Sequence, residues 1–146
     1  INLHFDLAQV LIDKGADPNI AETSGMAALY AAVDMHTLAE TVGRPNPKPH
    51  DTLDSPDIVK SLLAHGARPN ARLATPIMDR VHNDGNSDAA LGDGATPLMR
   101  AAKQADVAVM RLLLDGGADP SLATRTNALS CVSVISRPLC PLAGQE

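Results

Sequence analysis

The side chains best suited to chemistry in this 146-residue chain are five histidines and two cysteines. The histidines are His4, His36, His50, His65 and His82. No two of them are three or four residues apart, and neither cysteine lies near them in the sequence, whereas zinc ligands come in tight spacings. His65 directly precedes a glycine that we expect to end a helix, so we predict that it lies on the surface. The sequence therefore predicts no metal site and no cofactor.

Other catalytic patterns are also missing from the sequence. There is no Gly-x-Ser-x-Gly motif and no cysteine in a known nucleophile signature. No strand is predicted before Gly92-Asp93-Gly94, so we interpret it as a hairpin tip rather than a phosphate-binding loop. Asp84 and Asp88 lie in a turn-rich segment, where solvation or turn hydrogen bonds account for them. Cys131 and Cys140 are interpreted as free thiols, with a disulfide between them as the alternative. We expect no enzyme activity.

The composition narrows the classes of partner. The net charge is -5, and the chain has one Phe, one Tyr and no Trp. Nucleic-acid binders normally carry a basic surplus and often aromatic side chains for stacking, so we expect no nucleic acid. No apolar run approaches the roughly 18 residues that span a bilayer, so we expect no membrane span. The apolar residues are mostly aliphatic or small, which suits short, closely packed helices.

The chain contains an internal repeat. Three segments align without gaps: residues 5–19 (FDLAQVLIDKGADPN), 56–70 (PDIVKSLLAHGARPN) and 107–121 (VAVMRLLLDGGADPS). In each segment the apolar residues fall on one face of a helix. Each segment then has a glycine, which provides the left-handed conformation that ends a helix, and a proline that prevents its continuation. The segments therefore predict three equivalent helices.

A second helix is predicted ahead of the repeated one. It is clearest at residues 94–102 (GATPLMRAA), where Thr96 can cap the helix and Pro97 can open it. Residues 25–33 (GMAALYAAV) are a weaker copy. Ser55-Pro56-Asp57 is interpreted as an N-cap, a first-turn proline and an acid favoured by the helix dipole. Each unit should therefore be a pair of helices.

These residues resemble the ankyrin repeat, whose signature includes T-P-L-H-x-A within a period of about 33 residues. The spacing from Gly94 to Gly117 and the spacing from Asn19 to Gly25 are both those of that family. Met99 replaces the histidine of the motif. The resemblance implies an all-α helical-repeat solenoid, in which helix-turn-helix units are joined by short hairpin fingers and stacked into a curved slab.

Two insertions interrupt the expected array. Successive helix-ending glycines lie 51 residues apart instead of 33, so each interval has 18 extra residues. We place the insertions at about 35–53, between the helices of one unit, and about 73–91, in the finger before the last unit. Residues 34–42 are expected to extend a helix, 43–49 to form a polyproline-like bridge, and 75–81 to form a short helix. Because helix turns and fingers lie at opposite ends of the helices, the insertions should emerge on opposite edges.

The ends of the chain depart from the repeat. We assign residues 1–125 to the interrupted array and 126–146 to a degenerate repeat and tail. The first unit lacks its first helix, and the chain is expected to be a piece of a longer protein. Terminal repeats normally carry a polar outer face, which neither end supplies, so we expect marginal stability in isolation. We expect a monomer, with self-association through the uncovered ends as the alternative.

The resemblance implies a non-catalytic module that binds another protein. In ankyrin-like slabs, the finger tips and the exposed side of the first helices line a concave face. The matching positions are Ser24, Met26, Asp34, Met35, Asp93, Ala95, Arg100, Lys103 and Gln104. Met35 is the candidate for an adaptable apolar contact, and Arg100 is the candidate for a directional one.

Two other functions stay open. One is a structural spacer, either within a longer array or attached to a separate catalytic domain. The other is a small-molecule site beneath the proline-rich loop, for which a pocket lined by Tyr30, His36 and Arg44 would be the sign.

Overall fold

The computed structural model describes residues 4–36, 51–75, 77, 91 and 93–124. Its helices are α1 (Phe5–Asp13), α2 (Ala28–His36), α3 (Ser55–Ala64), α4 (Pro97–Lys103) and α5 (Val107–Asp115). Ala21 and Ala27 form an isolated antiparallel β-bridge in the loop between α1 and α2. The prediction of an all-α helical repeat is therefore confirmed.

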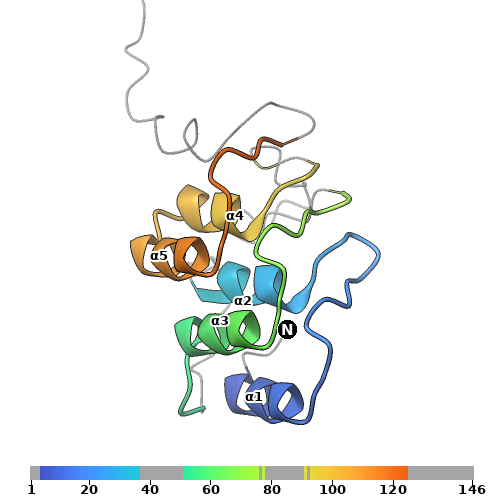
Figure 1. Ribbon diagram of the computed structural model, residues 1–146, viewed down its shortest axis with the longest axis vertical. Helices are drawn as coiled ribbons and strands as arrows, with labels where there is room; N and C mark the ends of the chain where they lie inside the picture. Colours follow the sequence, from blue (N-terminus) through green and yellow to red (C-terminus); the bar gives the residue numbers. More distant parts are fainter. Residues whose placement is uncertain (1–3, 37–50, 76, 78–90, 92, 125–146) are drawn as a thin grey trace, which may run out of the picture.

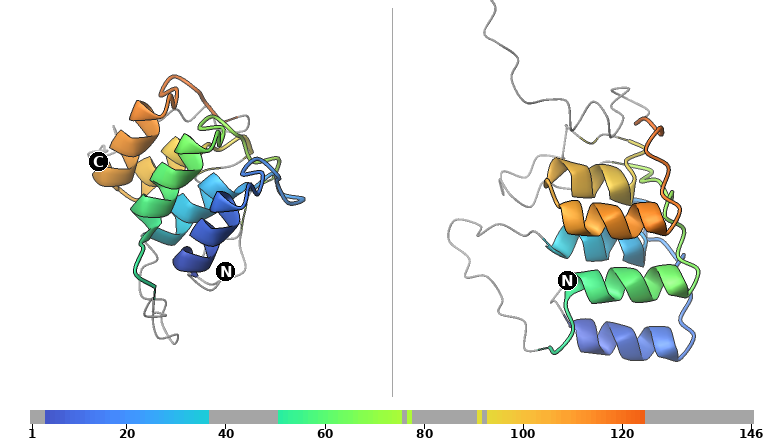
Figure 2. Two further views of the ribbon diagram at one scale, coloured as in Figure 1. Left: turned by 60° about the horizontal axis from the view of Figure 1, so that its bottom comes forward. Right: turned by 60° about the vertical axis from the view of Figure 1, so that its left-hand side comes forward.

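The helices form two rows. The repeated helices α1, α3 and α5 make one row, and the first helices α2 and α4 make the other (Figure 1). Within a unit, α2 packs on α3 and α4 packs on α5, while α2–α4, α1–α3 and α3–α5 contacts join the units. The loops that follow α1, α3 and α5 lie together along one edge (Figure 2). The arrangement is the predicted stack of helix pairs, each buried against its neighbours.

The helix ends follow the predicted chemistry. Gly15, Gly66 and Gly117 have φ values of 82°, 85° and 89°, in the left-handed region that favours glycine. A Cβ at any of these positions would meet no atom within 4 Å, so backbone conformation rather than lack of space requires the glycine. Thr96 caps α4, because its side-chain oxygen accepts the N–H of Met99 at 3.3 Å. These predictions from residue type are confirmed.

The cap of α3 differs from the prediction. The N-cap is Asp54, whose carboxylate accepts the Asp57 N–H at 3.1 Å, while the Asp54 N–H donates to the Asp57 carboxylate at 3.3 Å. This reciprocal pair is a capping box. Ser55 is the first helical residue instead, and its buried hydroxyl donates to the Ala32 carbonyl at 2.5 Å. Ser55 therefore joins α3 to α2 rather than capping its own helix.

The insertions fall largely outside the described residues, as do residues 37–50, 78–90 and the 126–146 tail with both cysteines. The helix predicted to open at Thr75 does not include Ile77, which is not helical. The described residues on either side of the insertions do lie at opposite edges. His36 ends α2 at the helix-turn edge, whereas Leu73 lies in the second finger, where it is bonded to Gly94 and Ala95.

The apolar core runs through the whole stack, because each helix pair contributes side chains to it. Its most enclosed large side chains, each at most 1% exposed, are Leu29, Val33, Val59, Leu98, Met99, Val109 and Leu113. They come from α2, α3, α4 and α5, so the two rows of helices share a single core.

An asparagine joins each unit to the next at the loop edge. The side-chain amide of Asn19 donates to the Gly66 carbonyl at 3.0 Å and accepts the Arg68 N–H at 2.9 Å. Asn70, one repeat later, makes the same two bonds to the third unit, at 3.1 and 2.8 Å. Ser121 stands at this position in the third unit. At each boundary, one asparagine side chain of the preceding unit therefore makes hydrogen bonds to two backbone groups of the next unit.

Asp6 makes a matching connection at the helix-turn edge. Its carboxylate accepts the N–H groups of Thr52 and Leu53, each at 3.0 Å, and its own N–H donates to the Asp51 carboxylate at 3.0 Å. The backbone hydrogen bonds from Thr52 and Leu53 hold the pKa of Asp6 below its ordinary value, although partial desolvation opposes them. The first turn of α1 is therefore fastened to the segment that leads into α3.

Substituting Asn70 should weaken the second boundary. Asn70→Ala removes two hydrogen bonds to backbone groups and should lower the free energy of unfolding by about 1–2 kcal/mol. The control is Gln9→Ala, which removes an amide whose described bond, to Asp13, stays within α1, and this should cost less than about 0.5 kcal/mol. Urea unfolding of both variants measures the difference. Equal losses would contradict the role given to Asn70.

The Asp6 contacts should make stability depend on pH in acid. The folded-state pKa of Asp6 lies below its unfolded value, so the unfolded chain takes up the proton first as the pH falls. Stability should therefore be lost below about pH 4 and be fully present above it. Asp6→Asn should make the urea midpoint depend less steeply on pH between pH 6 and pH 3, whereas Gln9→Ala, which removes no ionisable group, should leave that dependence unchanged. A residual slope is expected because bonds from Ser121 also lower the pKa of Asp119.

Candidate interaction surface

The first finger, residues 21–27, is closed by its own hydrogen bonds. The Glu22 N–H donates to the Met26 carbonyl at 3.1 Å, and the Gly25 N–H donates to the Glu22 carbonyl at 2.9 Å. The Ser24 hydroxyl donates to the Glu22 carboxylate at 2.5 Å. The tip therefore has a fixed shape before any partner contacts it.

Neighbouring fingers are bonded to one another through the backbone. The Ala74 N–H donates to the Ser24 carbonyl at 2.7 Å. The Leu73 N–H donates to the Ala95 carbonyl at 3.0 Å, and the Gly94 N–H donates to the Leu73 carbonyl at 2.9 Å. The first of these bonds joins the two fingers, and the other two close the second finger as the equivalent bonds close the first. The result is a continuous edge, which we call the finger edge and define as residues 21–27, 72–75 and 93–95.

Gly25 makes the close approach between fingers possible. A Cβ on Gly25 would lie 2.6 Å from the Ala74 nitrogen and 3.1 Å from the Arg72 carbonyl oxygen. The residue also has a φ of 82°, in the left-handed region. A larger residue would both strain the backbone and push the second finger away, so the finger edge depends on glycine here.

The structure divides the predicted contact residues into two groups. Those that keep part of their surface accessible are Ser24, Met26, Asp93, Lys103 and Gln104. They lie on the finger edge and at the C-terminal end of α4. The sequence-based placement on an accessible face is therefore consistent for this group.

For Asp34, Met35, Ala95 and Arg100, the prediction of an exposed position is wrong. Their exposed fractions are 0%, 5%, 0% and 2%, respectively. Because α2 and α4 stack directly on each other, the side of α2 that carries Asp34 is interior rather than solvent-facing. Arg100 is therefore not the directional partner contact that its residue type suggested.

Asp34 and Arg100 form a buried ion pair between the first helices of two units. The Arg100 Nη2 lies 2.7 Å from the Asp34 Oδ1, and the two side chains are 3% and 0% exposed, respectively. Asp34 is nine residues after Gly25, whereas Arg100 is six residues after Gly94. The two positions differ by three residues in the repeat alignment, which is close to one helical turn. The sequence therefore does contain a signal for this ion pair, namely an acid and a base at these two positions.

His36 and Asp106 form a second polar connection. The His36 Nδ1 contacts the Asp106 Oδ2, and the Asp106 Oδ1 accepts the Val109 N–H at 3.1 Å. Asp106 is thus the N-cap of α5, and it joins that helix to the C-terminal end of α2. Its side chain is 4% exposed and that of His36 is 29% exposed. The pair has a structural role, and no cysteine or serine nucleophile contacts it among the described bonds.

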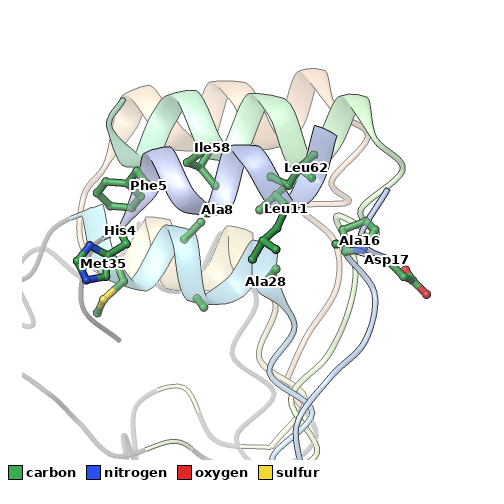
Figure 3. A pocket seen from close by; sticks show the side chains of 14 residues that line it. His4, Phe5, Ala8, Leu11, Ala16, Asp17, Ala28, Met35, Ile58 and Leu62 are labelled. Carbon is green, nitrogen blue, oxygen red and sulfur yellow. The ribbon is translucent and has the colours of Figure 1, made fainter. Parts of the chain in front are cut away.

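The structure contains an apolar groove of about 290 Å³ between α1, α2 and α3. Phe5, Ala8 and Leu11 face Ala28 and Met35 across it (Figure 3). Neither Tyr30 nor His36 lines this groove, and Arg44 lies outside the described residues. The pocket that would indicate a small-molecule site beneath the proline-rich loop is therefore not the one observed. Within the described residues, no group of three metal-ligating side chains gathers.

Comparisons with known proteins agree with this geometry. The family model described as "Ankyrin repeat" matches residues 93–125, which contain α4, α5 and the following loop. The chain is an ankyrin-repeat array. It is 30% identical over 120 residues to the "Ankyrin repeat and SAM domain-containing protein 6" of Danio rerio, a match that covers 79% of this chain and 15% of that protein.

A solved structure is similar to this ankyrin-repeat array as well. The ankyrin repeat domain of Bcl-3, described as a unique member of the IkappaB protein family, superposes with a TM-score of 0.55 at 23% sequence identity. The match covers 86% of this chain and 40% of that chain. The array thus spans less than half the length of either protein. None of its described helices is long and apolar enough to cross a membrane.

The buried ion pair should couple the stability effects of its two residues. Arg100→Met leaves a buried carboxylate and should lower the free energy of unfolding by about 3 kcal/mol or more, and Asp34→Val should have a similar effect. The double variant removes both charges and should be more stable than either single variant. Urea unfolding of the four proteins measures the coupling. If the losses in the free energy of unfolding were strictly additive, the two side chains would not stabilise each other.

Proposed function

We propose that this ankyrin-repeat array is a non-catalytic module that binds another protein along its finger edge and the adjoining end of α4. Ankyrin repeats are in general protein–protein interaction modules. The observation that carries the proposal is the backbone bond from the Ala74 N–H to the Ser24 carbonyl, which holds the second finger against the first. A surface that is ordered in advance loses little conformational entropy when a partner binds.

The chemistry of this surface supports a mixed polar and apolar contact. Met26 supplies a flexible thioether side chain that adapts to apolar partner groups. Lys103 and Gln104 add a cation and an amide at the end of α4, and Asp93 adds a carboxylate on the last finger. Arg100 contributes to this surface only indirectly, by holding α4 on α2.

A spacer within a longer array is the second candidate function. It is favoured by the exposed apolar side chains Leu7, Leu11 and Leu114 on α1 and α5, at the two ends of the stack. In a spacer these end surfaces, rather than the finger edge, would carry the contacts, and they would be contacts to further repeats.

Charge reversal distinguishes the two functions. A photo-crosslinking residue at position 103 captures the partner, and its affinity is then measured with purified components. Lys103→Glu should weaken binding by about tenfold, because it reverses a charge on the proposed surface. The matched control, Lys60→Glu at an exposed position of α3, should change affinity by less than about twofold.

Circular dichroism and the melting temperature confirm that both variants keep the fold. Equal affinity for Lys103→Glu and wild type would remove the proposed surface. A partner that is lost only with Lys60→Glu would place the contact on the row of α1, α3 and α5 instead.

A further inference from the structure

Two leucines on α1 are exposed although their repeat equivalents are buried. Leu7 and Leu11 are 58% and 54% exposed. The equivalent residues, 51 and 102 positions later, are each at most 3% exposed; they are Ile58, Leu62, Val109 and Leu113. Because all three helices have the same apolar pattern, the difference comes from what covers them and not from the helix itself.

The missing cover is a first helix. Ile58 and Leu62 belong to α3, on which α2 packs, and the equivalent residues of α5 lie in the helix on which α4 packs. Among the described residues, no first helix accompanies α1, and its recorded helix contact is with α3. The apolar groove lies at the vacant position, between α1 and α2 (Figure 3).

The groove continues a row of helices that already exists. α4 stacks on α2, and a helix in the groove would stack on α2 from the opposite side while packing on α1. It would thereby repeat both contacts that α2 makes, with the next first helix and with the repeated helix of its own unit. Ala28, Ala31, Ala32 and Met35 form the α2 wall, and the small alanine side chains permit close approach of another helix.

We propose that the groove holds a short first helix of the same kind as α2 and α4, supplied by the polypeptide that precedes Ile1. The occupying helix has apolar side chains on the face toward α1 and small side chains on the face toward the alanines of α2. Its register follows from the last unit, where Gly94 precedes the first helix and Gly117 ends the repeated one. A glycine therefore precedes the occupying helix, and its distance from Gly15 in the sequence equals the distance from Gly94 to Gly117. The match covers only 15% of the Danio rerio relative, which leaves length for such a segment in a protein of this type.

A graft tests whether the groove accepts this helix. Residues 93–106, which contain α4 and end directly before α5, replace residues 1–4 ahead of Phe5. Phe5 is the repeat equivalent of Val107, so the graft keeps the spacing of the last unit. The melting temperature should rise by about 5 °C, because Leu7 and Leu11 become covered. A control graft with glutamate in place of its copies of Leu98 and Ala101 should give no rise.

Leu11→Gln reports directly on coverage of the groove. In the 146-residue chain it should shift the melting temperature by less than about 2 °C, because Leu11 is already in solvent. In the grafted chain it should lower the melting temperature by about 5 °C or more. In the natural polypeptide extended upstream of Ile1, the loss should match that of the grafted chain.

Three results would overturn the proposal. One is a graft that stabilises no more than its glutamate control. Another is a loss in the extended natural polypeptide no larger than in the 146-residue chain, since the upstream segment would then not cover Leu11. The third is a dimer of the 146-residue chain, seen by sedimentation, that Leu11→Gln dissociates, since a second copy would then be the occupant.

Discussion

A side chain in this array is buried only where the neighbouring helix covers it. Leu62 is 2% exposed and its repeat equivalent Leu11 is 54% exposed, although both stand on the same face of the same kind of helix. A helix pair of this size cannot enclose a core alone, so its stability is the sum of its own folding and of its interfaces with adjacent units. Every structural feature of the array therefore has to be understood as part of a boundary between units.

Polar contacts of several kinds hold the boundaries between units, and they differ in burial. Asn19 and Asn70 act in the accessible loops, Asp6 acts at the helix-turn edge, and Asp34 with Arg100 acts inside the row of first helices. A buried ion pair adds little net stability compared with apolar side chains, but it penalises any other alignment of the two helices. This matters at the α2–α4 boundary, because both insertions lie between those helices in the sequence and short connections cannot set their register.

Residue type and spacing were sufficient to predict the helix pairs. Gly15, Gly66 and Gly117 end their helices for a backbone reason that is local, and local reasons are visible in a sequence. The burial of Asp34 and Arg100 was not predicted, because helical periodicity separates polar from apolar faces but does not show which polar face a neighbour covers. The cap of α3 was misassigned by one residue for a related reason. Asp54 and Ser55 are both good caps, and only the contact of Ser55 with Ala32 decides between them.

The same constraint determines where a partner can bind. The first helices stack too closely to leave Asp34 and Arg100 accessible, so the proposed contact uses groups that stacking leaves outside, namely the fingers and the end of α4. The fingers are joined by backbone bonds, so their shape is set by the array, and the proposed function assigns specificity to residues such as Met26 and Asp93. A surface built in this way grows with each added unit. A first helix seated on α1 and α2 would therefore not only cover Leu11 but also fix the N-terminal limit of the surface that a partner meets.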